Sequence, residues 1–229
     1  MLEDGLSYPI RGDWLGRTII GAVLGFLSFL VLPAVFLMGY FVRVLESTVS
    51  GADEPPAFEE WGDLFVTGLV ATVISLVYSI VPLVAYTFLV GTLFGVGGMV
   101  GGDGGGLLAG LGLMTLLTFI PVMLLIYYIV PAALTNYAHT GEVGSAFDFG
   151  VIKSVVLSLE YLLAMLLPIA IGIVVWFVVA FLAMTVVGLL LVPFIYFYAY
   201  VAIFRMFGLA FSKTSSTTRT TPAAGAQSI

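Results

Sequence analysis

Long uncharged runs dominate this sequence and predict transmembrane helices. The longest run, residues 161–204, contains no charged side chain. A bilayer core about 30 Å thick needs about 20 apolar helical residues per crossing, so this run predicts two crossings joined by a tight turn. Another run, 18–42, is long enough for one tilted span and too short for two. Hydrocarbon is therefore the expected solvent for most of the chain.

The complete pattern predicts an all-α, polytopic transmembrane helical bundle of five kinked spans, with six as the alternative. The expected spans are 18–42, 64–94, 107–138, 145–180 and 186–207. Prolines inside them, such as Pro33 and Pro82, remove a backbone hydrogen bond and predict kinks. The bundle is expected to occupy residues 1–211. A tail rich in Ser, Thr and Ala, 212–229, is expected to be disordered.

Recurring proline and tyrosine positions predict an internal helical-hairpin repeat. Pro33 is followed by Tyr40, and Pro131 is followed by Tyr137. Each pair precedes a polar loop that contains an Ala-Phe-acid triplet, and a partial third copy starts at Pro193. The pattern predicts two hairpins of the same sense plus an extra helix, related by an axis along the membrane normal.

The polar loop after the first predicted span contains an interfacial element. Its aromatic residues fall at i, i+3 and i+7 after a Pro-Pro pair, which suits a first helical turn, and its acids take other faces. This spacing predicts a short amphipathic helix on the membrane surface. The alternative is the solvated first turns of the next span. The element consists of Phe58, Glu59, Glu60, Trp61, Asp63 and Phe65.

Three short motifs add local predictions. Residues 95–106 contain so many glycines, each costing about 1 kcal/mol in a helix relative to Ala, that a flexible loop outside the hydrocarbon is expected. Ser145 and Asp148 fit a capping box that starts the fourth span. Gly21 and Gly25 form a GxxxG step, which either permits close helix approach or reflects ordinary membrane glycine usage.

Composition and charge bear on habitat. The chain is 61% hydrophobic and 9% charged, with a net charge of −6 and only two lysines. At about 1 M salt the screening length is only about 3 Å, so crowding of acids in loops costs little there. The balance indicates a high-salt habitat, with drift in short loops as the alternative.

Basic residues predict the orientation. With five spans, the side that holds the acidic loop 46–63 and the C-terminus contains five of the seven basic residues, and the N-terminal side contains two. The positive-inside rule therefore predicts a cytoplasmic C-terminus and acidic loop, and an external N-terminus. Shallow insertion of the N-terminal segment would instead put both ends inside.

Six polar residues are candidates for a transport path or for ion pairing. Ionisable groups at membrane depth are costly and usually have a function. Simpler interpretations are also available. Glu160 would then be a solvated carboxylate at the interface, and His139 a plain interfacial histidine. Arg205 would either pair with Glu46 or Glu160 or snorkel to the interface, and Tyr196 and Tyr200 would anchor the helix. The candidates are Glu160, His139, Asn136, Arg205, Tyr196 and Tyr200.

Signatures of catalysis are missing from the sequence. There is no cysteine and one histidine, and neither HExxH nor GxSxG occurs. Seven basic residues are too few for a strong nucleic-acid surface. We therefore expect no enzymatic activity, no cofactor and no metal. The expected role is a membrane scaffold, subunit or lipid-organising component. Its partners are then membrane lipids and a second copy or another subunit. A small transporter or channel near the Pro-kinked spans is the alternative.

Several segments also carry a family resemblance. They are residues 8–12, the acidic run 53–65 with its Pro-Pro-Ala-Phe-Glu-Glu-Trp-Gly core, and Pro131-Ala132-Ala133 with its later Ala-Phe-Asp. The chain resembles, over roughly residues 5–210, an archaeal, chiefly haloarchaeal, multi-pass family catalogued as domain of unknown function 4013. The resemblance implies a halophilic archaeal cell membrane. It implies no activity, substrate or site residue.

Overall fold

The computed structural model describes residues 2–219, except the side chains of residues 103, 109, 116 and 215–219. Every regular element in this range is a helix, which confirms the all-α prediction. The elements are α1 (Leu2–Ser7), η1 (Tyr8–Ile10), α2 (Trp14–Phe26), α3 (Val31–Val49), α4 (Trp61–Val100), α5 (Gly102–Leu117), α6 (Phe119–Thr140), η2 (Val143–Phe147), α7 (Phe149–Val156), α8 (Leu159–Leu182) and α9 (Val186–Arg219). They form two compact units: residues up to Thr72 together with those from Pro131, and residues Val73–Val130.

Among the described residues, five helical stretches are long and apolar enough to cross a membrane, as the uncharged runs predicted. These stretches are Val31–Val49, Trp61–Val100, Gly104–Thr140, Leu159–Leu182 and Val186–Thr214. Large hydrophobic side chains such as Phe88, Phe177 and Phe181 are exposed on them. Hydrocarbon covers such surfaces without the free-energy cost that water would impose. The chain is therefore a membrane protein.

The predicted first span is divided into two helices. The run 18–42 turns at residues 27–30, between α2 and α3. Pro33 lies in the first turn of α3, where a backbone N–H has no intrahelical partner, so the proline removes no helical hydrogen bond there. The expected mid-span kink at this proline is wrong. The 13 residues of α2 extend about 20 Å, less than the thickness of the hydrocarbon core.

The fourth span begins later than predicted. The carboxylate of Asp148 accepts hydrogen bonds from the backbone N–H groups of Gly150 and Val151 and so caps the short helix α7. The hydroxyl of Ser145 donates to the carbonyl of Glu142 instead of capping a helix. The expected capping box is therefore wrong. A second cap, Ser158, starts α8.

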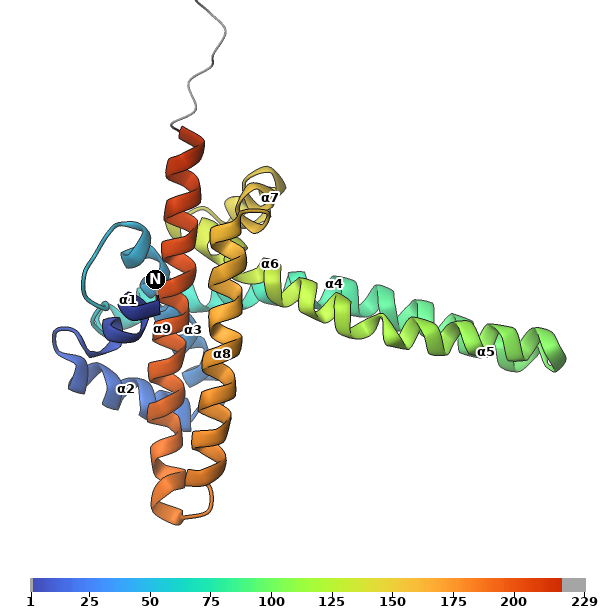
Figure 1. Cartoon of the computed structure of the whole chain (residues 1–229), viewed down its shortest axis with the longest axis horizontal. Helices are drawn as coiled ribbons and strands as arrows, with labels where there is room; N and C mark the ends of the chain where they lie inside the picture. Colours follow the sequence, from blue (N-terminus) through green and yellow to red (C-terminus); the bar gives the residue numbers. More distant parts are fainter. Residues whose placement is uncertain (1, 220–229) are drawn as a thin grey trace, which may run out of the picture. The chain divides into compact units, whose positions relative to one another are not determined.

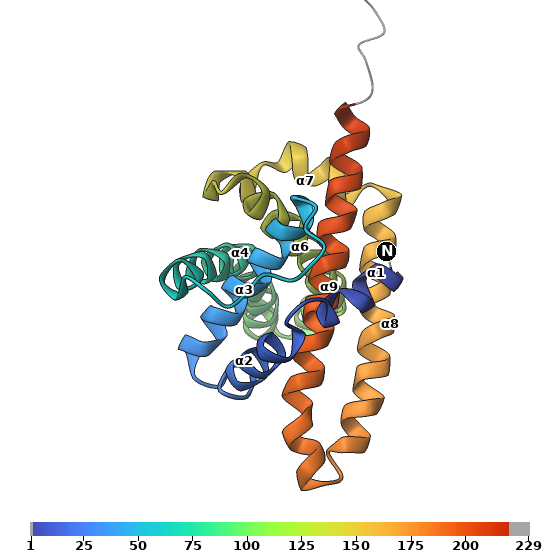
Figure 2. The same ribbon diagram turned by 90° about the vertical axis from the view of Figure 1, so that its left-hand side faces the viewer.

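Helix α9 is the central element of the first unit. It forms an antiparallel hairpin with α8, and α1 also packs against it (Figures 1 and 2). The step formed by Gly21 and Gly25 faces α9, because a Cβ on Gly21 would meet the ring of Phe197. α9 remains helical to Arg219 and so includes the start of the expected tail, while residues 220–229 lie outside the described residues.

Helices α3 and α4 cross at two glycines. A Cβ on Gly39 would lie 2.0 Å from the carbonyl oxygen of Leu64, and one on Gly68 would lie 1.9 Å from that of Val35. Because backbone atoms lie at these distances, no side-chain rotation could make room. The crossing therefore requires glycine on both helices.

The second unit is a helical hairpin in which the glycine-rich segment is mostly helical. α4 continues to Val100 and α5 begins at Gly102, so only the junction departs from a helix, with φ of +64° at Gly101 and +55° at Gly102. In hydrocarbon, backbone polar groups must bond to one another, which favours the helix despite its glycines. Gly105 approaches the carbonyl of Gly97 where a Cβ would lie only 2.5 Å away. The expected flexible loop is therefore wrong.

Candidate functional site

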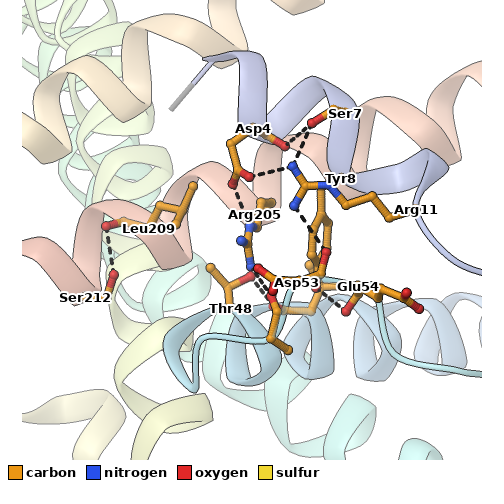
Figure 3. Close-up of polar contacts among 12 residues, drawn as sticks. Asp4, Ser7, Tyr8, Arg11, Thr48, Asp53, Glu54, Arg205, Leu209 and Ser212 are labelled. Atoms are coloured by element: carbon orange, nitrogen blue, oxygen red, sulfur yellow. Dashed lines mark hydrogen bonds and ion pairs between the residues drawn. The ribbon is translucent and has the colours of Figure 1, made fainter.

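A polar network in the first unit surrounds the guanidinium of Arg205, a residue only 5% exposed. Its Nε donates to Oδ2 of Asp4 at 3.0 Å, and its Nη1 donates to the carbonyl of Ala52 at 2.7 Å. Its Cζ lies 4.3 Å from the ring centroid of Tyr8, a cation–π distance. Three segments far apart in the sequence therefore meet at this cation (Figure 3).

The carboxylate of Asp4 bridges two arginines. Its Oδ1 accepts a hydrogen bond of 2.7 Å from Nη2 of Arg11, which also donates to the hydroxyl of Ser7 at 2.8 Å. Burial by itself would raise the pKa of Asp4, but hydrogen bonds from Arg11 and Arg205 and their positive charges outweigh it and lower the pKa below its ordinary value. Asp4 is therefore held as an anion.

The loop after α3 completes the network. The hydroxyl of Tyr8, which is fully buried, donates to the carbonyl of Glu54 at 2.9 Å. Burial raises the pKa of Tyr8, and the nearby charge of Arg205 only partly opposes it. Nη1 of Arg11 donates to the carbonyl of Asp53 at 3.1 Å. We call the contacts among residues 2–11, residues 52–54 and α9 the N-terminal clasp.

Local sequence explains how α1 reaches α9. Gly5 faces Met206, and a Cβ there would lie 2.5 Å from the methionine's terminal methyl carbon, so glycine permits the close approach. The hydroxyl of Tyr198 donates to the carbonyl of Leu6 from the same side. Asp4 in the first turn of α1 also suits the positive end of a helix dipole.

The clasp corrects the expected position of the N-terminus. The N-terminal segment was expected on the side opposite the acidic loop, yet Tyr8 and Arg11 bond to residues 53 and 54 of that loop. Both segments therefore lie at the same end of the first unit as Arg205. The alternative of shallow N-terminal insertion fits this arrangement, because α2 is short and returns through α3.

The interfacial element is not the amphipathic helix that the spacing predicts. Residues 55–60 are not helical, Glu60 has a φ of +51°, and α4 begins at Trp61. The alternative applies to Trp61, Asp63 and Phe65, which form the first turns of α4. Phe58 is buried and stacks on Tyr40 with ring centroids 4.1 Å apart.

The acids of this element bind Arg43 of α3. Nη2 of Arg43 lies 2.8 Å from Oδ2 of Asp63 and 3.3 Å from Oε2 of Glu60. Its Nη1 donates to the carbonyl of Glu59 at 2.7 Å. The guanidinium of Arg43 therefore joins α3 to the start of α4 and to the residues just before it.

The polar candidates on α6 and α8 lie apart. Glu160 is exposed in the first turn of α8, and Lys153 belongs to the separate helix α7. His139 is exposed, with its ring centroid 5.9 Å from that of Phe211. Asn136 is buried, and its Nδ2 donates to the carbonyl of Ser145 at 2.7 Å. Asn136 therefore joins α6 to the short helix η2 that follows it.

The remaining candidates lie on α9. Arg205 pairs with Asp4 and not with Glu46 or Glu160, the partners considered from the sequence. Tyr196 and Tyr200 are partly exposed and stack on each other, with centroids 6.4 Å apart. Sequence reasoning missed Asp4 as a partner, because only its acidic character in an N-terminal helix marks it.

An apolar groove of about 640 Å³ lies between α2, α3 and α9, and the sequence analysis did not identify it. Tyr196 and Tyr200 lie along it, and Pro193 and Leu37 face the bare backbone of Gly25, at 3.8 and 4.0 Å from an ideal Cβ. The hydroxyl of Ser28, which is in the lining, donates its hydrogen bond to the carbonyl of Leu24 in α2. The groove has no charged residue in its lining.

Comparisons with known proteins identify a family and no activity. The family described as protein of unknown function (DUF4013) matches residues 26–184, which confirms the family named from the sequence. The matched segment is shorter than the expected 5–210 and leaves out both Asp4 and Arg205. No curated protein and no solved structure matches the chain.

Proposed function

We propose that this chain, which belongs to the DUF4013 family, is a non-enzymatic component of the cell membrane that organises the surrounding lipid. The observation that carries the proposal is the contrast between its surfaces. Large apolar side chains are exposed along α4, α5, α6, α8 and α9, whereas Arg205, Arg43 and Asn136 make internal contacts. Such a surface is suited to holding lipid chains.

Transport is less well supported. A polar path needs polar side chains that converge on one cavity. Glu160 and His139 are exposed at helix ends, Asn136 contacts a loop, and Arg205 is enclosed by the N-terminal clasp. Of the six polar candidates, only Tyr196 and Tyr200 line the groove between α2, α3 and α9. The other residues of its lining are mainly apolar.

An orientation accompanies the proposal: the end that contains Arg205 faces the cytoplasm. The hydroxyls of Ser158 and Thr214 lie 3.1 Å apart, which places the α7–α8 junction, near Lys153, beside the later part of α9. With the N-terminal segment on the same side, all seven basic residues gather there, while residues 44–152 contain none. The positive-inside rule then favours a cytoplasmic location for both ends.

The narrower expectations of an archaeal, high-salt membrane and of a homo-oligomer or a complex with another membrane subunit are part of the proposal. The glycine-rich helices supply packing surface for a second copy. Net charge −6 with only two lysines suits strong screening.

Reconstitution with chain-labelled spin lipids tests the role. We expect a motionally restricted lipid fraction larger than that of a control protein with a similar number of spans. A substrate-dependent hydrolysis or flux that a single substitution, such as Glu160→Gln, abolishes would refute the proposal.

A further inference from the structure

We propose that the groove between α2, α3 and α9 is a binding site for the hydrocarbon chains of one membrane lipid, selected by its chains and not by its headgroup. This inference rests on the proposed function and names a site and a ligand class for it. The groove lies in the apolar parts of its helices, between the turn 27–30 and the core ring of Phe197. Its volume falls within the range of about 300–1,000 Å³ usual for ligand sites.

The dimensions of the groove suit a hydrocarbon chain. The α9 lining runs from Leu189 to Tyr200, about 16 Å at 1.5 Å per residue. An extended chain that lies along α9 would make dispersion contacts with the lining over this whole length.

The absence of side chains on α2 shapes the groove. Gly25 leaves space toward Pro193, whereas Gly21 is already covered by Phe197. An empty groove would lose dispersion contacts along its whole lining. At this depth the available molecules are lipids, and their flexible chains fill such a surface without desolvating a polar group.

The groove has no charged residue that could select a lipid by its headgroup. The lining contains no charged residue, and the turns nearest the groove, 27–30 and 183–185, contain none either. Arg17, one helical turn before Gly21, is turned toward the clasp, where Nη1 donates to the carbonyl of Arg11 at 2.9 Å. No cation in the lining is therefore available to select an anionic headgroup.

Photoreactive lipids test this site directly. The full chain would be reconstituted in nanodiscs that contain phosphatidylcholine or phosphatidylglycerol with a diazirine in one chain, irradiated, and mapped by mass spectrometry. We expect labelling of Leu189 and Val192 to exceed that of Ile173 on the exposed face of α8 at least fivefold, with both headgroups. Gly25→Leu should abolish this excess, because its side chain fills the groove.

Gly172→Leu is the matched control, because Gly172 is a helical glycine with nothing within 4 Å of an ideal Cβ. It should leave the excess unchanged. If Gly25→Leu does not fold, Leu189→Trp, at a partly exposed lining residue, should reduce labelling of Val192 in the same way.

Three results would overturn the site. Equal labelling of Val192 and Ile173 would mean that no chain is bound preferentially. Labelling only by phosphatidylglycerol would mean headgroup selection. An oxidised disulfide dimer of Val192→Cys, with labelling lost, would mean that a second copy fills the groove. A persistent motionally restricted lipid fraction in any of these cases would leave the proposed function standing without this site.

Discussion

Oδ2 of Asp4 lies 3.0 Å from Nε of Arg205, although 201 positions separate the two residues in the sequence. The pair holds α1 against α9 and leaves the buried guanidinium with a carboxylate partner. Breaking such a pair on one side leaves a charge without compensation, which is more costly than never forming the pair. Asp4 is therefore the acid that links the N-terminal segment to the buried cation of α9.

Asp4→Asn should destabilise the protein. The amide keeps the shape but removes the negative charge facing Arg205. Because the Asp4 side chain is 34% exposed, water would partly screen the loss. We expect a decrease of about 1–2 kcal/mol in the free energy of unfolding, measured by reversible unfolding in mixed micelles. Glu3→Gln makes the same charge change at an exposed position of α1 and should have little effect.

The contribution of Asp4 should depend on pH. Its folded-state pKa lies below the ordinary value of 3.8, so the stabilisation is present above that value and is lost as pH falls through the folded-state pKa. The stability difference between wild type and Asp4→Asn should be constant above about pH 5 and should close below about pH 3.8. A difference that persists unchanged to pH 2 would mean that the carboxylate does not stabilise the fold through its charge.

Glycine at the crossing of α3 and α4 should be required for stability. In Gly39→Ala the new carbon would lie 2.0 Å from the carbonyl oxygen of Leu64, so the helices must separate. We expect a loss of about 2–3 kcal/mol, as for an overpacked core, in the same unfolding measurement. Gly68→Ala should behave alike.

Gly62→Ala is the control for this crossing, because it is also in α4 but has nothing within 4 Å of an ideal Cβ. It should leave stability equal or slightly higher, since Ala is the better helix former. Equal losses for Gly62→Ala and Gly39→Ala would show that steric contact at the crossing is not the cause.

The sequence predicts the long helices of this protein well because their signal is the length of an uncharged run. The turn at residues 27–30 was missed for the same reason: Leu27-Ser28-Phe29-Leu30 is nearly as apolar as the helices around it. Hydropathy indicates whether a segment lies in hydrocarbon or in water, but it does not indicate whether the segment is a helix or a turn. For the glycine-rich segment the error was the opposite one: a loop was predicted where the chain is mostly helical. Helix propensities measured in water overstate the cost of glycine in an apolar setting.

The candidate site was less predictable. Arg205 was recognised as an unusual charge, but the chain contains thirteen acidic residues that could pair with it. Asp4 is selected by the tertiary approach of α1 to α9, where Gly5 faces Met206 and the hydroxyl of Tyr198 donates to the carbonyl of Leu6. The groove likewise depends on how α2 folds back beside α9. No local pattern encodes either relationship.

The most direct test of the account is the side of the membrane on which the N-terminal segment lies. The chain has no cysteine, so Glu3→Cys and Asp53→Cys, both at exposed positions, can be labelled separately in sealed vesicles with a membrane-impermeant maleimide. The N-terminal clasp predicts that both react from the same side and are protected from the other. Reaction of the two cysteines from opposite sides would contradict the contact between Asp4 and Arg205 and the arrangement built on it.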